Sequence, residues 1–97
     1  MAKLIIPTPL RKFSDNEATF ETAAFTVADA VAELVNEYPD LGKHLLDNNG
    51  KIRSFIKIFV GEDDIRSLQG EDTPLEIDTI VSIVPAIAGG NFSFFKL

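Results

Sequence analysis

Apolar residues recur at helical spacing in one stretch of the chain, which predicts the main helix. They are separated by three or four positions: Val27, Ala30, Val31, Leu34, Val35 and Tyr38. One face of this helix is therefore apolar and the other polar. Thr26 precedes it and Asp29 lies in its first turn, as in a helix N-cap, and Pro39 disfavours helical backbone in the residue before it. We predict a helix over residues 27–38.

Four runs rich in β-branched, aromatic and other apolar residues predict strands, at residues 3–6, 18–25, 55–60 and 79–84. The polar turn at residues 14–17 makes the first two an antiparallel hairpin. We expect a short helical turn at residues 40–47, polar turns at 48–50 and 61–64, and an irregular stretch at 65–75. The order strand, strand, helix, strand, strand predicts an α+β roll, with one main helix packed across one face of a mixed sheet.

Length and charge narrow the classes of partner. The 97 residues are 45% apolar and 25% charged, which is typical of one globular domain. Nine Lys and Arg against fifteen Asp and Glu give a net charge of -6. Nucleic acids and anionic membrane surfaces attract basic proteins, so neither is an expected partner. A basic protein surface suits this charge better.

The sequence offers little for catalysis or metal binding. There is no cysteine, which excludes disulfides, thiolate metal sites and a cysteine nucleophile. His44 is the single histidine, and we expect it at the surface. We also expect Glu33 in a solvated helix face and Arg66 paired with Asp63 or Asp64. We predict no catalytic residue, no metal site, no signal peptide and no membrane span, and hence a cytoplasmic protein.

The end of the predicted last strand carries the most specific motif. Pro85-Ala86-Ile87-Ala88-Gly89-Gly90 follows Val81-Ser82-Ile83-Val84, and Asp63-Asp64-Ile65-Arg66 and Asp72-Thr73-Pro74-Leu75 precede it. With the order of elements, these motifs resemble the MoaD/ThiS family of ubiquitin-like sulfur carriers, which have a β-grasp fold. The resemblance runs to Gly90. The insert at residues 40–53 is similar to the CysO-like, cysteine-biosynthesis branch. Two departures are Glu76-Ile77-Asp78-Thr79, where a Gly-Asp pair is common, and the continuation to Leu97.

The resemblance implies a carrier domain at residues 1–90 and an extension at 91–97. An E1-like adenylating enzyme, using ATP and Mg²⁺, would activate the Gly90 carboxylate, and a sulfur donor would convert it to a thiocarboxylate. Ala88, Gly89 and Gly90 would thread into the partner's active site, because residues with small side chains or none fit a narrow channel. A cysteine-synthase-like protein, or a molybdopterin or thiazole synthase, would accept the sulfur. The chain itself would bind no cofactor and would not be an enzyme.

Two further expectations concern processing and docking. Gly90 is joined to Asn91 by an amide, so a peptidase such as a JAMM-type metalloprotease would first cleave between them, making the chain a pro-protein. Apolar surface near the tail would hold the partners, and Phe59, Val84 and Ile87 are the candidates, each of which is more often core than interface.

Alternatives remain open at the Gly-Gly pair. It is also a hairpin-turn signal, in which residues 83–88 pair with the Phe-rich residues 92–95. A ubiquitin-like modifier, conjugated to other proteins through Gly90, needs the same exposed end. A β-grasp binding module would keep the extension permanently.

Overall fold

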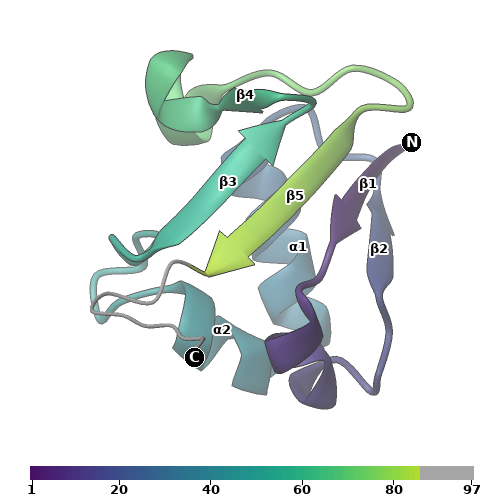
Figure 1. Ribbon diagram of the computed structural model, residues 1–97, viewed down its shortest axis with the longest axis vertical. Helices are drawn as coiled ribbons and strands as arrows, with labels where there is room; N and C mark the ends of the chain where they lie inside the picture. The colour runs from purple at the N-terminus through teal and green to yellow at the C-terminus, as the bar shows by residue number, and fades with distance from the viewer. Residues whose placement is uncertain (86–97) are drawn as a thin grey trace, which may run out of the picture.

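The computed structural model describes residues 1–85, in which five strands form one mixed sheet with helices behind it (Figure 1). The strand order is β2-β1-β5-β3-β4. β1 and β5 are parallel, and the other neighbours are antiparallel. Their bounds are β1 (Ala2–Ile5), β2 (Thr19–Thr22), β3 (Ile56–Val60), β4 (Asp63–Asp64) and β5 (Ile80–Pro85). The predicted α+β architecture is confirmed.

Helix α1 (Val27–Glu37) begins and ends where the sequence predicts, within one residue. The Thr26 hydroxyl accepts a hydrogen bond from the Asp29 backbone N–H at 3.2 Å, which caps the first turn. The short helix α2 (Pro39–Leu45) follows directly and packs on α1. Gly42 permits this approach, since a Cβ there would lie 2.5 Å from Val35 Cγ1. In residues 1–85, no helix has the length and apolar character to cross a membrane.

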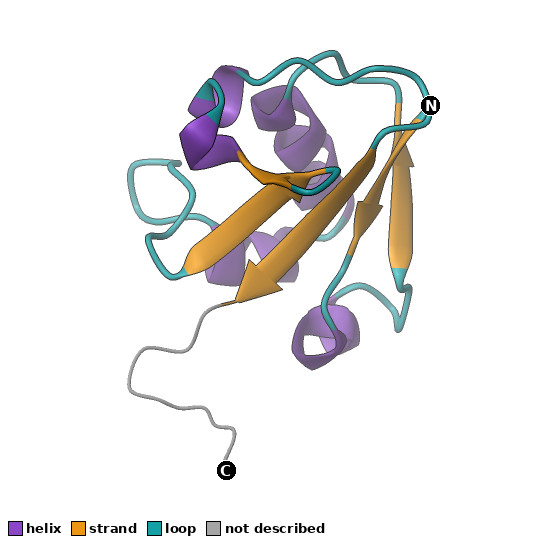
Figure 2. Cartoon of the chain, turned by 45° about the horizontal axis from the view of Figure 1, so that its top comes forward, coloured by secondary structure: helices purple, strands orange, loops and turns teal. Residues whose placement is uncertain are grey.

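The core lies between the sheet and the two helices (Figure 2). Its fully buried members come from strands, helices and the segment after β1: Leu4, Ile6, Val27, Ala30, Leu34, Leu41 and Val81. Strand residues alternate between the two faces of a sheet. In β3 and β5, every second side chain therefore points away from the core. These side chains lie on the opposite face of the sheet, which no helix of residues 1–85 covers (Figure 1).

The first hairpin is confirmed, but its second strand is shorter than the predicted 18–25. β2 ends at Thr22, whose buried hydroxyl accepts from the Ala24 N–H at 3.0 Å and turns the chain out of the sheet. The same hydroxyl donates to a Glu33 carboxylate oxygen at 2.8 Å. Glu33 is exposed, as expected for the polar face of the helix, and its hydrogen bond with Thr22 also ties α1 to β2. A 3-10 helix (Thr8–Phe13) fills most of the connection from β1 to β2.

Two other local expectations need correction. The predicted turn at residues 61–64 contains β4, whose two residues pair with Phe59 and Val60 of β3. Arg66 was expected to pair with Asp63 or Asp64, but its guanidinium donates to the Ser54 carbonyl at 2.8 Å. The Asp64 carboxylate instead accepts from the Arg66 backbone N–H at 2.8 Å and caps the 3-10 helix Ile65–Ser67. A further 3-10 helix, Gly70–Asp72, follows it.

The predicted turn at residues 48–50 is confirmed, and Asp47 organises it. Its carboxylate accepts from the N–H groups of Lys51 and Asn49, at 3.0 and 2.8 Å. These two hydrogen bonds, the one from Lys51 first, hold the pKa of Asp47 below its usual value because they favour the ionised form.

Because of this turn, we expect the free energy of unfolding to depend on pH in the acid range. Because the pKa of Asp47 is lower in the folded than in the unfolded state, its ionised carboxylate stabilises the fold. This contribution to the free energy of unfolding is complete above about pH 4 and is lost as the pH falls through the folded-state pKa. Asp47→Asn removes the titration. The free energies of unfolding of the two proteins, measured with urea, should therefore converge between about pH 7 and about pH 3. A constant difference over that range contradicts the role of the carboxylate.

Candidate functional site

Strand β5 fixes the base of the predicted tail. Lys3 to Ile5 of β1 pair with Ile80 to Ser82 along one edge of β5. Along the other edge β3 forms five residue pairs, ending with Ile56 opposite Pro85. The strand that leads into the Gly-Gly motif is therefore paired on both sides as far as Ser82, and β3 alone holds it from there to Pro85. Figure 2 shows β5 as a central strand of the sheet.

The predicted reactive and threading residues, Ala88, Gly89 and Gly90, lie outside the described residues. So do the predicted cleavage position at Asn91 and the predicted docking residue Ile87. Their roles stay predictions, as does the alternative hairpin to residues 92–95. What the structure does define is the point from which this segment departs, at Pro85.

Phe59 and Val84 lie on the same face of the sheet, the one that the helices leave uncovered. Phe59 is opposite Ser82 and Val84 is opposite Lys57, so the two apolar residues are diagonal neighbours. Val84 is 41% exposed and Phe59 is half-buried. Neither belongs to the buried core, contrary to the commoner outcome for such residues. Among residues 1–85, both side chains therefore lie outside the core and close to the end of β5.

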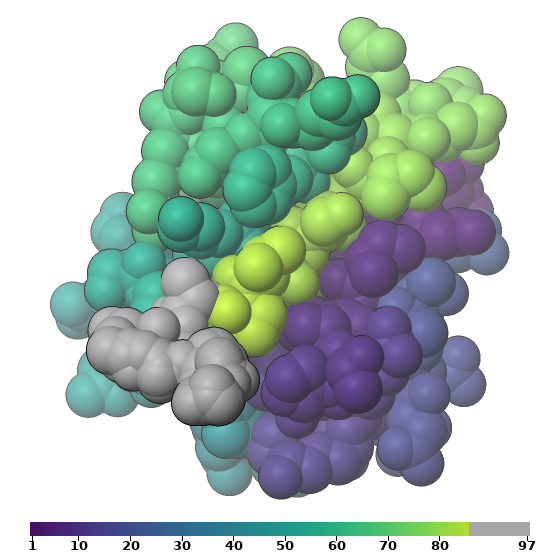
Figure 3. All heavy atoms as spheres, viewed as in Figure 1, coloured from purple at the N-terminus to yellow at the C-terminus, as the bar shows by residue number. Residues whose placement is uncertain are grey.

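Two apolar residues that the sequence did not single out extend this face. Ile5 of β1 is opposite Ser82, and Ile80 of β5 is 42% exposed opposite Lys3. We call Ile5, Phe59, Ile80 and Val84 the outer strip. Figure 3 looks onto this side of the molecule, where β1, β5 and β3 lie side by side. The strip contains residues of three strands, which become neighbours only through the register between those strands. The sequence of one strand therefore does not predict it.

Basic side chains flank the outer strip. Lys57 is exposed beside Val84, and Lys3 lies between Ile80 on β5 and Glu21 on β2. An ammonium group at the edge of an apolar patch adds orientation and faster association to a contact with an acidic partner surface. The strip is thus an apolar surface with positive charge near the tail, on a chain that is acidic as a whole.

His44 and the acidic side chains of residues 1–85 were not predicted to form a catalytic or metal site. His44 is exposed and stacks on Phe13, with ring centroids 4.2 Å apart, which agrees with its predicted surface position. Within residues 1–85, no three His, Cys, Asp or Glu side chains are grouped so as to hold a metal ion. The features that stand out in this part of the chain are the end of β5 at Pro85 and the apolar outer strip beside it.

Comparison with known proteins connects this geometry to a family. Residues 4–90 match the ThiS family. The chain is 30% identical over 87 residues to the sulfur carrier protein CysO of Mycobacterium tuberculosis, covering 88% of this chain and 94% of the relative. The match therefore spans nearly the whole of both proteins.

Solved structures confirm the predicted β-grasp fold. The BexX/CysO complex of Amycolatopsis orientalis contains a chain that superposes with a TM-score of 0.83 at 26% identity, covering 93% of this chain and all of that one. The small archaeal modifier protein 1 of Methanosarcina acetivorans gives a TM-score of 0.81 at 22% identity, covering 92% and 95%. The second likeness concerns the fold alone.

Proposed function

Because this chain belongs to the ThiS family and is similar to CysO sulfur carriers over nearly its whole length, we propose that it carries sulfur as a thiocarboxylate on Gly90. The observation that carries the proposal is the strand pairing at Pro85, the residue from which the tail departs. β3 pairs with β5 as far as Pro85, which lies opposite Ile56, and so the sheet presents the Pro-Ala-Ile-Ala-Gly-Gly segment from a fixed point. The chain supplies the group that reacts, and its partners supply the catalytic residues.

The proposed chemistry needs a free carboxylate. A peptidase of the JAMM metalloprotease type hydrolyses the amide between Gly90 and Asn91, and residues 91–97 leave. The new carboxylate attacks the α-phosphorus of ATP, and pyrophosphate departs from the Mg²⁺-ATP bound by an E1-like enzyme. Sulfide from a sulfur donor then attacks the acyl carbon, AMP leaves, and the Gly90 thiocarboxylate remains. With no Cβ at positions 89 and 90, the end of the tail fits a narrow channel.

The similarity to CysO favours a cysteine-synthase-like protein as the acceptor of the sulfur. A molybdopterin or thiazole synthase is the other class of acceptor for a carrier of this family. We place the reaction in the cytoplasm, because the adenylating partner consumes ATP.

The intact mass of the untagged protein, purified from its own cells while the pathway is active, tests this function. We expect a species ending at Gly90, a fraction of which has one carboxylate oxygen replaced by sulfur. Conjugates of Gly90 with lysines of other proteins, without any thiocarboxylate, would identify a protein modifier instead. Full-length chain alone would contradict the proposal and indicate a β-grasp binding module.

The outer strip gives a separate prediction about docking. Val84 and Ile80 lie on the same strand, on the same face and at almost equal exposure, but only Val84 is near the tail. Val84→Ser should raise the KM of the adenylating enzyme for the carrier about fivefold, which corresponds to about 1 kcal/mol of lost apolar burial. Ile80→Ser is the matched control and should leave KM unchanged. Equal effects of the two changes contradict a docking site near the tail.

A further inference from the structure

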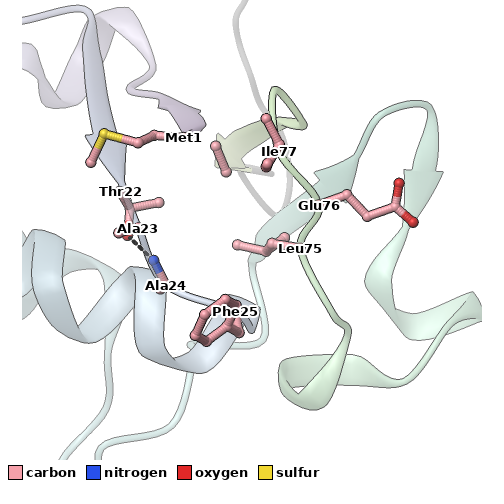
Figure 4. A pocket seen from close by; sticks show the side chains of 9 residues that line it. Met1, Thr22, Ala23, Ala24, Phe25, Leu75, Glu76 and Ile77 are labelled. Carbon is pink, nitrogen blue, oxygen red and sulfur yellow. Dashed lines mark hydrogen bonds between the residues drawn. The ribbon is translucent and has the colours of Figure 1, made fainter.

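A second apolar surface lies at the end of the sheet away from Pro85. Phe25 and Ile77 are 80% and 81% exposed, the largest exposures among the bulky apolar side chains of residues 1–85. They border a groove that Met1, Ala23, Ala24 and Leu75 also line (Figure 4). We call the groove lined by these six residues the polar-end groove, because it lies at the end of the sheet that the acidic residues 61–79 cross. Side chains of this size exposed together mark an interaction site.

The groove is held in place by hydrogen bonds on both sides. The Leu75 N–H donates to the Phe25 carbonyl at 2.8 Å, and the Val27 N–H donates to the Thr73 carbonyl at 3.0 Å. The Glu76 N–H donates to the Thr79 hydroxyl at 3.2 Å, which fixes the loop that carries Ile77. The backbone therefore presents Phe25 and Ile77 in a preorganised arrangement, and a partner pays little ordering entropy on binding them.

The segment that brings Glu76 and Ile77 to the groove is acidic. Residues 61–79, which cross this end of the molecule between β3 and β5 (Figure 1), contain seven Asp or Glu and one basic residue, Arg66. The rest of the chain is balanced, so this segment accounts for the net charge of -6. Glu76 lines the groove and Asp78 follows Ile77, while the amino group of Met1 and Lys3 are the nearby positive groups. A basic partner is favoured by this field and an acidic one is repelled.

We propose that the polar-end groove is a docking site for a partner protein segment with apolar side chains flanked by lysine or arginine. The apolar side chains cover Phe25 and Ile77, and the basic ones meet the acidic segment at residues 61–79. A second copy of this chain fits poorly, because its own groove carries the same negative surroundings. The groove lies at the start of β5 and the tail departs from its end. A protein bound here therefore leaves Pro85 and the outer strip near it free for the enzymes that act on the tail.

The test is a titration of the full-length, isotope-labelled chain with two peptides, followed by NMR. The probe is acetyl-Lys-Leu-Phe-Leu-Lys-amide, and its matched control replaces both lysines with glutamate. We expect the lysine peptide to shift the amide signals of Phe25 and Ile77 and to bind about fivefold or more tightly than the glutamate peptide. Raising the ionic strength from about 0.01 to about 0.1 M should reduce this preference, since the Debye length falls from about 30 to about 10 Å.

Variants separate the groove from non-specific apolar binding. Phe25→Ser and Ile77→Ser should each weaken the lysine peptide several-fold without unfolding the protein, because both side chains are exposed. Phe55→Ser, at a 44% exposed phenylalanine outside both the groove and residues 61–79, should have no effect. Shifts centred on the outer strip, equal binding of the two peptides or no binding would overturn the proposal.

Two further outcomes also count against it. Shifts of Phe25 and Ile77 that depend on protein concentration alone would show that a second copy occupies the groove. Shifts of the same signals on replacing Phe92, Phe94 and Phe95 with serine, without peptide, would show that the chain's own C-terminal segment does. None of these results bears on thiocarboxylate formation at Gly90, so the two proposals fail independently.

Discussion

Gly90→Pro is expected to leave the protein full length, with Leu97 at its end, and without any thiocarboxylate. The proposed cleavage uses the amide between Gly90 and Asn91, and every later step uses the carboxylate that cleavage exposes. Proline fixes φ near -65° and adds a ring at a position where the proposed partners require no side chain at all. The expected effect is therefore complete loss of the sulfur-bearing species.

The measurement is the intact mass of the variant from the same cells as the unchanged protein. A chain that ends at Gly90 is the control, because it bypasses the peptidase and should be adenylated and thiocarboxylated directly. The described core and all of its strand pairs lie within residues 1–85, so this shorter chain retains them. Thiocarboxylate on the full-length Gly90→Pro protein would disprove the assignment of Gly90.

Leu34→Ala is expected to cost about 2–5 kcal/mol of the free energy of unfolding. Leu34 is fully buried on α1 and belongs to the core cluster that joins the helix to the sheet. Its replacement removes apolar burial and leaves a cavity that the rigid surroundings fill only in part. Since a small domain has about 5–15 kcal/mol in total, this one change removes a large fraction of its stability.

Urea denaturation of the two proteins at neutral pH measures this loss. Leu68→Ala is the matched control, because Leu68 is 43% exposed and its truncation should change the free energy of unfolding by no more than about 0.5 kcal/mol. A loss below about 1 kcal/mol for Leu34→Ala would mean that the helix packs less closely on the sheet than this structure shows.

Local patterns in the sequence predicted the elements whose signal lies within a few residues. The apolar spacing from Val27 to Leu34, the capping Thr26 and the proline at position 39 together gave α1 with both ends nearly correct. The runs that became β3 and β5 were found within one residue at each end. In each case the preference of a short segment and its burial agree, and no distant partner changes the outcome.

Elements that depend on distant partners were missed or misjudged. β4 consists of two aspartates and exists because β3 offers its edge to them. Thr22 ends β2 and holds Glu33 eleven positions away, and Arg66 reaches the Ser54 carbonyl across a similar separation. Such contacts form between side chains and backbone groups that only the complete fold brings together, so residue type and spacing do not predict them.

The same division applies to function. The sequence by itself determined the Pro-Ala-Ile-Ala-Gly-Gly motif, the lack of cysteine and the net charge of -6, and these are enough to suggest a carrier and to disfavour nucleic acid. The tertiary structure decided where the features of residues 1–85 lie relative to one another. Strand register brings Phe59 and Val84 to one uncovered face. The crossing from β3 to β5 brings Glu76 and Ile77, from the acidic segment, to the groove that Phe25 also lines, at the end of β5 opposite Pro85. The sequence determines which side chains are present, whereas the pairing of strands that are distant in the sequence determines which of them share a surface.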